Sequence, residues 1–242
     1  MKFNYKSLDK DVKQVVNPPF WVTYHYVNTA LRKSYEYAFR SFLNKNKRYK
    51  LLDYGCGAKP YEHVLKEYCK SYIGIDIGNN PKAQYSIMPG ERLPVEDSSF
   101  DIVLSSQVLE HVQDVSQYLK ECHRVLSKNG FLFLSTHGTW QYHSSPNDFQ
   151  RWTAFGLKKL IEEHQFEIIG FIPILGQLAL TSQLRLTFYD SFANRIGLLG
   201  RILLFPVSVL YQLKMRFEDL ITPKRVKERD SAIYLVIARN KE

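Results

Sequence analysis

Cysteine is scarce in this sequence of 242 residues, and its few copies lie far apart. Cys56, Cys69 and Cys122 are an odd number at wide spacing, which excludes a disulfide framework and a zinc cluster as organising features. No other clustered ligand spacing indicates a metal, so we expect no metal site. Few and unpaired cysteines are typical of a reducing compartment.

Long hydrophobic runs are also missing. The longest, residues 202–213 (ILLFPVSVLYQL), is too short to cross a bilayer and contains Pro206, and residues 1–13 have no apolar signal core. The composition, 45% apolar and 24% charged residues, is that of one globular domain. We therefore expect a cytoplasmic protein.

Acidic side chains are sparse outside the middle of the chain. The net charge is +9 overall. Residues 1–50 have 11 basic and 3 acidic side chains, residues 51–150 have 8 basic and 12 acidic ones, and residues 151–242 have 14 basic and 9 acidic ones. Basic flanks therefore surround an acidic middle. Nucleic acid, an anionic membrane or an anionic substrate could use these flanks, and a merely solvated basic surface would have the same composition.

Strand and helix patterns alternate through the middle of the chain. Short apolar runs at 50–54, 71–76, 100–105 and 131–136 predict buried strands. A helix is expected from 115, because Asp114 can cap it with Gln117 three residues later, and Gly130 marks its end. Such repeated units predict a doubly wound, mostly parallel sheet with helices on both faces.

The stretch DYGCG at 53–57 follows the first strand and predicts a ligand site at the carboxyl edge of the sheet. Its two glycines let the backbone approach a ligand, and Asp76, after the next strand, can accept hydrogen bonds from a ribose. Pro60 stands at the third glycine position of the dinucleotide fingerprint, and no Gly-Lys-Ser/Thr follows as in a phosphate loop. With a dinucleotide site and a phosphate loop excluded, the sequence predicts a site for a nucleoside-type ligand that has no pyrophosphate.

Four segments in order resemble class I S-adenosylmethionine-dependent methyltransferases of the methyltransferase type 11-like group. They are DYGCGAKPY at 53–61, GID at 74–76, LPVEDSSFDIVLSSQVLEHV at 93–112 and RVLSKNGFLFLST at 124–136. The resemblance implies a Rossmann-like, seven-stranded, mostly parallel sheet whose last hairpin is antiparallel and ends in 231–240. It also implies a single domain, with an N-terminal helical extension (1–47), a cofactor-binding core (48–176), a helical insertion or lid (177–227) and a final strand (228–242).

The cofactor that this resemblance implies is S-adenosyl-L-methionine. The glycine loop would surround its methionine end and Asp76 would hold its ribose hydroxyls, although turns and a helix cap would also explain these residues. The positions that match the family's cofactor site are Asp53, Gly55, Cys56, Gly57, Asp76, Ile77, Gly90, Glu91 and Ser106. Pro89 stands where many relatives have an aspartate, so the adenine amino group has no assigned partner.

Methyl transfer needs an acceptor held in line and, for a hydroxyl acceptor, a base. The candidate bases are His111, His137 and His143. The segment YHSSPNDFQRWT at 142–153 resembles a subgroup associated with bacterial surface-polysaccharide and other glycan pathways, which implies a sugar hydroxyl as the acceptor. The residues expected to bind this nucleotide-linked or lipid-linked substrate are Tyr142, Asp148 and Arg151, although Asp148 and Arg151 could instead be a helix cap and its ion-pair partner.

Two appendages flank the core. Segment 20–43 is expected to form a helix; in similar proteins such a helix packs over the cofactor, but core packing is the expected role of most of its tyrosines. Segment 198–217, in the insertion, combines apolar residues with flanking arginine and lysine, as a buried helix, a homodimer face or a peripheral membrane helix would. An RNA methyltransferase and a noncatalytic partner subunit remain as alternative functions, but no RNA-stacking motif is present, which disfavours nucleic acid.

Overall fold

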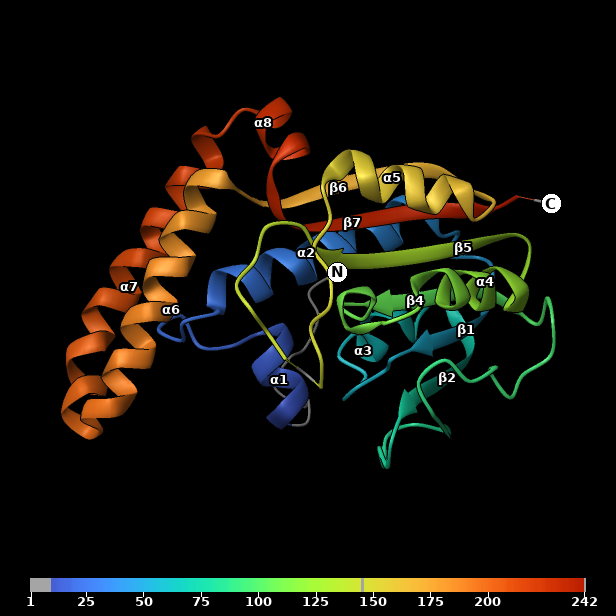
Figure 1. The fold of residues 1–242 in the computed structure, drawn as a ribbon, viewed down its shortest axis with the longest axis horizontal. Coiled ribbons are helices and arrows are strands. Elements are labelled where there is room, and N and C mark those ends of the chain that lie inside the picture. Colours follow the sequence, from blue (N-terminus) through green and yellow to red (C-terminus); the bar gives the residue numbers. More distant parts are fainter. Residues whose placement is uncertain (1–9, 145, 242) are drawn as a thin grey trace.

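The computed structural model describes residues 10–144 and 146–241, and a seven-stranded sheet forms its centre (Figure 1). The first nine residues of the predicted extension, and Ser145 and Glu242, lie outside the described residues. The strands are β1 (Tyr49–Tyr54), β2 (Cys69–Ile77), β3 (Tyr85–Ile87), β4 (Phe100–Ser106), β5 (Leu126–His137), β6 (Phe166–Gly176) and β7 (Ser231–Asn240). Their order is β3-β2-β1-β4-β5-β7-β6, and only β7 pairs antiparallel to its neighbours. The predicted fold class is confirmed.

Helices cover both faces of this sheet (Figure 1). The α-helices are α1 (Lys10–Val16), α2 (His25–Phe42), α3 (Glu62–Leu65), α4 (Val115–Val125), α5 (Ala154–Glu163), α6 (Gln177–Ile196), α7 (Leu198–Ile221) and α8 (Lys224–Arg229). Adjacent strand residues point to opposite faces, so Leu51 packs with α1, α2 and α3 while Leu52 packs with α4 and α5. The strands therefore read as continuous apolar runs because both faces are buried.

Helix α4 begins as the sequence predicts but ends earlier. The Asp114 carboxylate accepts a hydrogen bond from the Gln117 amide at 2.9 Å, which satisfies one of the free donors of the first turn. The helix ends at Val125, and Leu126 already pairs with Phe100 of β4. The prediction of a helix end at Gly130 was therefore wrong, because sheet pairing takes over where the helical pattern still continues.

Helix α2 lies on one face of the sheet and not over the expected cofactor edge. Tyr35 and Phe39 are fully buried there, and the Tyr35 hydroxyl donates to Ser135 Oγ at 2.9 Å. Among the described residues, none from α2 lines the cavity at the carboxyl edge. Core packing is therefore confirmed for Tyr35, whereas the position over the cofactor that similar proteins imply is not found at this cavity.

Helices α6 and α7 form an antiparallel arm that extends from the sheet, on the side where the parallel strands end (Figure 1). Gly197, at φ 77°, makes the turn between them, and a side chain at Gly200 would collide with Ala193 of α6. Helix α7 has 24 residues and a mean hydropathy of 1.4 in its most apolar window, which makes it long and apolar enough to cross a membrane. The apolar letters of 202–213 had suggested a segment too short for this, because the helix continues beyond them.

Candidate functional site

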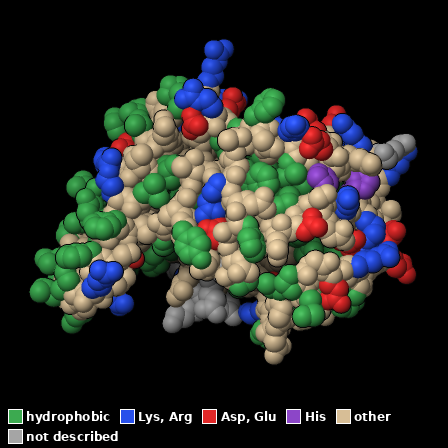
Figure 2. Space-filling view, in the orientation of Figure 1, with side chains coloured by type: hydrophobic (Ala, Val, Ile, Leu, Met, Phe, Trp, Pro, Cys, Tyr) green, Lys and Arg blue, Asp and Glu red, His purple; other side chains and the backbone are tan. Residues whose placement is uncertain are grey.

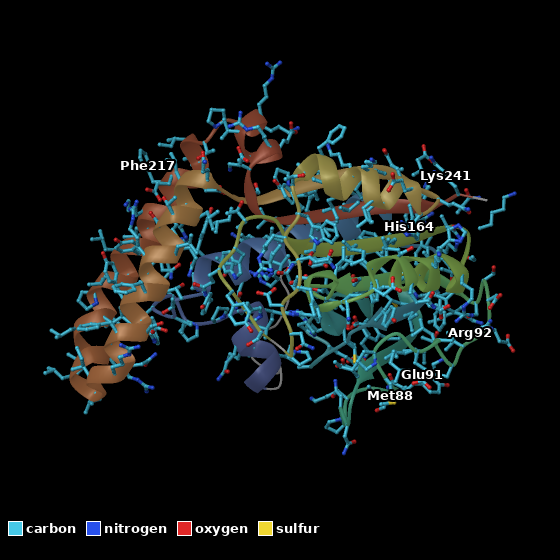
Figure 3. The ribbon with its side chains drawn as sticks, in the orientation of Figure 1. Met88, Glu91, Arg92, His164, Phe217 and Lys241 are labelled. Carbon is cyan, nitrogen blue, oxygen red and sulfur yellow. The ribbon has the colours of Figure 1, made fainter. Side chains whose placement is uncertain are left out.

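A cavity of 730 Å³ opens at the carboxyl ends of β1, β2 and β4. Its volume is within the range of small-molecule sites, and its place is where open parallel sheets bind ligands. The predicted residues that line it are Gly55, Gly57, Asp76, Ile77, Gly90, Glu91 and His111. Figure 3 labels Glu91 on the loop after β3, beside Met88, whose backbone amide donates to the Glu91 carboxylate at 2.8 Å. The sequence therefore located this part of the wall correctly.

The two predicted loop glycines differ in what surrounds them. Gly55 has φ 80°, and a Cβ there would lie 2.5 Å from Val108 Cγ2. Gly57 has φ 48°, and nothing lies within 4 Å of the Cβ position. Both positions favour glycine because the backbone is left-handed there. Only Gly55 also lacks the room for a side chain, whereas a side chain at Gly57 would enter open space.

Asp76 holds this loop in place. Its carboxylate accepts hydrogen bonds from the amides of Gly57 and Ile77, each at 2.9 Å, and from Asn80 Nδ2 at 2.6 Å. A carboxylate has about four acceptor positions, so about one is left for a ligand hydroxyl. Sequence reasoning missed Asn80, which only the turn after β2 brings back to Asp76.

Three of the residues assigned to the cofactor do not line the cavity. Asp53 is buried and accepts a 2.5 Å hydrogen bond from the Tyr72 hydroxyl, and burial raises its pKa to about 7. The Cys56 thiol is also buried, and burial raises its pKa to about 12, so it stays protonated. Ser106 lies beside buried tyrosines instead. These three side chains can therefore affect a ligand only indirectly, for example through the conformation of the glycine loop at 53–57.

His111 is the one predicted base that lines the cavity among the described residues. It ends the 3-10 helix η2 (Leu109–His111), and its Nδ1 hydrogen-bonds the backbone carbonyl of Asn147. A carbonyl can only accept, so Nδ1 must carry a proton and a neutral ring has its lone pair on Nε2. Nε2 is therefore the ring nitrogen that could act as a base in this residue of the cavity wall.

The other two histidines lie beside His111 but outside the cavity wall. The ring of His143 is 5.5 Å from that of His111 and 6.0 Å from that of His137. His137 Nδ1 is 2.9 Å from Glu110 Oε1, and its ring stacks on Trp140. Burial opposes the charge of Glu110, but the bond to His137 keeps the pKa of this carboxyl below its usual value. The structure thus pairs His137 with a buried carboxylate that the sequence gave no reason to single out.

The residues predicted to bind the acceptor hold their own loop together. Asp148 accepts a bidentate pair of hydrogen bonds from Arg151, which lowers the pKa of Asp148 to about 2. The remaining guanidinium hydrogens go to the carbonyls of Trp140, Gln141 and Gln150. All five donors of Arg151 are in use, so it has none for an acceptor. The structure thus supports the ion-pair alternative for Arg151, and Tyr142 is exposed away from the cavity.

Much of the remaining wall was not predicted. The residues that sequence reasoning missed are Tyr54, Ile87, Gln107, Val108, Val112, Gln113, Asp114, Gln117, Tyr118, Glu121, Pro146, Asn147 and Phe149, whereas Pro89, which the sequence placed beside the adenine, does line the wall. Segment 146–149 reaches the cavity because the Phe149 amide donates to the Glu110 carbonyl at 2.9 Å. The sequence singled out this loop but not these residues in it, since a long-range backbone contact decides which of them reach the cavity.

Comparisons with known proteins agree with this arrangement. Residues 52–134 match the family model of a methyltransferase domain. A ubiquinone biosynthesis O-methyltransferase of Pelagibacter ubique (strain HTCC1062) is 30% identical over 156 residues, which cover 59% of this chain and 56% of that protein. The chain spans about half the length of the curated relatives it matches.

Solved structures share the fold at low identity. A 1,6-didemethyltoxoflavin-N1-methyltransferase of Burkholderia thailandensis with bound S-adenosylhomocysteine has a TM-score of 0.54 at 12% identity, covering 88% of this chain and 79% of that one. The cyclase SpnF has a TM-score of 0.56 at 16% identity, covering 87% and 81%. At such identities the likeness concerns the fold alone.

Together these comparisons show that residues 52–134 resemble a methyltransferase domain and that the chain shares the fold of S-adenosylmethionine-dependent methyltransferases. The fold around residues 52–134 is the Rossmann-like fold of such enzymes. The predicted resemblance to surface-glycan enzymes has no counterpart among these relatives, whose names concern ubiquinone biosynthesis.

Proposed function

We propose that this chain is an O-methyltransferase that transfers the methyl group of S-adenosylmethionine to a hydroxyl of a sugar or another small hydroxylated acceptor, including one linked to a lipid or a nucleotide. The observation that carries the proposal is the single cavity wall in which Asp76 and the glycine loop meet the oriented imidazole of His111. A nucleoside site and a base thus border one space.

The cavity residues fit the cofactor. Asp76 has an acceptor position left for a ribose hydroxyl, and Ile77 would pack on the adenine. Gly55 and Gly57 would allow the methionine end to approach the backbone. When bound, the cofactor supplies an electrophilic methyl group on a sulfonium.

His111 removes the acceptor proton in this proposal. The Asn147 carbonyl fixes the Nδ1 proton, so Nε2 takes the hydroxyl proton as the oxygen attacks. Segment 146–149 forms part of the cavity wall around the acceptor. Positioning and one proton transfer are all that the reaction asks of the protein.

The relatives support oxygen as the methylated atom, because they are O-methyltransferases by name. The glycan acceptor rests on the loop resemblance at 142–153 alone. The cyclase SpnF has the same fold, so activity has to be measured and cannot be inferred from the fold.

Calorimetric titration with S-adenosylhomocysteine tests the cofactor site. Asp76→Ala should weaken binding roughly 100-fold or more, because it removes a charged acceptor for the ribose. Asn80→Ala is the matched control: it deletes one partner of Asp76 but keeps the carboxylate, so its affinity should stay within about tenfold of wild type. Equal affinity for wild type and Asp76→Ala would contradict the assignment.

A panel of sugar nucleotides, lipid-linked sugars and phenols, with S-adenosylhomocysteine release as the readout, tests the reaction. His111→Asn should lower kcat roughly 100-fold or more, while Asn can still donate to the Asn147 carbonyl. His137→Asn and His143→Asn are the matched controls. Methylation of bulk RNA in place of these acceptors, or an equal loss of kcat in His137→Asn and none in His111→Asn, would contradict the proposal.

A further inference from the structure

Helix α7 buries two polar residues beside Met215 on its inner side and exposes many large apolar residues on its outer side. Ser208 and Gln212 are buried against the body, and Gln212 bonds the Tyr26 amide at 3.0 Å and the Val22 carbonyl at 2.9 Å. The opposite side carries large apolar side chains that are at least half exposed, namely Leu198, Leu199, Ile202, Leu203, Leu213 and Leu220. A helix that faces water normally carries polar residues on its outer side, so this apolar outer face is suited to an apolar surrounding.

Helix α6, beside it, also buries polar residues, together with Leu180 and Leu186, and exposes large aromatic ones. Ser182 and Gln183 are fully buried, and the Ser182 hydroxyl donates to Glu218 of α7 at 2.6 Å. Phe188 and Phe192 are exposed on its outer side. Figure 2 shows hydrophobic side chains gathered over this arm, and Phe217, labelled in Figure 3, projects from α7. Two neighbouring helices thus present apolar outer faces.

The charge on the arm indicates the partner. Residues 191–217 contain no acidic side chain, and Arg195 and Arg201 are exposed on either side of the Gly197 turn. Lys214 pairs with Glu218, and Arg216 lies over the Phe20 ring beside His25, so these two cations are already engaged. A second copy docked at this end of the arm would add further arginines and no carboxylate from residues 191–217. An anionic lipid surface provides both an apolar layer and the opposite charge.

We propose that the α6–α7 arm docks on a membrane that contains anionic lipids and lies in its interfacial layer without crossing it. Crossing is disfavoured because the Gly197 turn ties α7 to α6, which would carry Arg185, Asp190 and Arg195 into the hydrocarbon. Lying flat, the outer faces reach the acyl chains while the arginines stay among the headgroups.

The arm is fixed to the body near the cavity edge of the sheet. Asp219 accepts hydrogen bonds from the Gly176 amide, at the end of β6, and from the Tyr26 hydroxyl, and it pairs with Lys227 at 3.1 Å. Membrane docking would therefore hold the whole domain at the lipid surface, where it can meet a membrane-borne acceptor. The docking does not depend on the proposed methyl transfer and can be tested without it.

Sedimentation with vesicles tests the proposal, using full-length protein and either phosphatidylcholine alone or a mixture with about one-third phosphatidylglycerol. We expect wild type to bind the anionic vesicles and to dissociate as salt increases. Leu203→Glu should lower the partition coefficient at least about tenfold, and Arg201→Gln about fivefold on anionic vesicles. Phe155→Glu on α5 is the matched control, since Phe155 is 81% exposed and far from the arm in sequence; it should bind like wild type.

Sedimentation velocity without lipid provides the competing outcome. All three variants replace exposed side chains, so circular dichroism should show them folded. A wild type that fails to bind vesicles at low salt overturns the proposal. A wild-type dimer that Leu203→Glu converts to monomer, with no vesicle binding, would show that a second copy covers the arm.

Discussion

The two glycines of the loop after β1 should respond differently to alanine. In Gly55→Ala the new methyl would lie 2.5 Å from Val108 Cγ2 and 2.9 Å from Cγ1, at a φ of 80°. In Gly57→Ala the backbone is also left-handed, with a φ of 48°, but no atom lies within 4 Å of the methyl position. The pair therefore separates conformational strain from overpacking within one motif.

The expected energies follow from these two contributions. A left-handed backbone costs a non-glycine residue about 1–2 kcal/mol, and overpacking against a stiff side chain adds about 1–3 kcal/mol. Alanine also restricts the unfolded chain, which offsets about 0.4–1 kcal/mol. Gly55→Ala should therefore destabilise the fold by roughly 1.5–4 kcal/mol and Gly57→Ala by roughly 0–1.5 kcal/mol.

Urea unfolding without cofactor measures the difference. With a slope of about 2–3 kcal/mol/M, the midpoint of Gly55→Ala should lie about 1 M below that of Gly57→Ala at an unchanged slope. Val108→Ala in the Gly55→Ala background is the control, because it removes the methyl groups that collide. Equal midpoints for the two alanine variants, or no recovery of the difference between them in the double variant, would refute the packing argument.

Two further predictions concern groups below and beside the cavity. Burial raises the pKa of Asp53 to about 7, so between about pH 4 and pH 7 the folded protein keeps a proton that the unfolded chain has lost. The free energy of unfolding should therefore fall as the pH rises through this range. Asp53→Asn should abolish this fall and be more stable than wild type by up to roughly 4 kcal/mol above pH 7. Urea midpoints of both proteins at pH 4 and pH 8 check this, and a constant difference between them would count against it. Arg151→Lys keeps the charge but loses the five-donor fork, so the loop should loosen and kcat/KM for the acceptor should fall at least about tenfold, with cofactor affinity within about twofold of wild type. Equal losses in both quantities, measured by initial rates and calorimetry, would show that the whole domain had been damaged.

Local patterns in the sequence predicted most of the sheet. Strands such as 100–105 and 131–136 are apolar runs bounded by polar residues, and this pattern depends only on neighbours along the chain. The boundary at Leu126 was missed because pairing with Phe100 of β4, a contact distant in sequence, competes there with the helical pattern.

The candidate site was predictable only in part. Gly55, Gly57 and Asp76 were found because the chemistry of a nucleoside site requires those residue types directly after two strands. Asn147 and Phe149 were not, because backbone contacts with segment 109–111 place them at the cavity.

The sequence by itself determined four buried strands, the start of helix α4, the position of the glycine loop and the uneven charge, because each depends on residue type and short spacing. The tertiary structure decided which polar groups already have hydrogen-bond partners within the protein. The Tyr72 hydroxyl donates to Asp53, and all the donors of Arg151 bond to four other residues. It also decided which face of α7 is turned outward. A stripe of leucines has the same letters whether it faces a core or a lipid surface, so only the packing of the folded chain can distinguish the two.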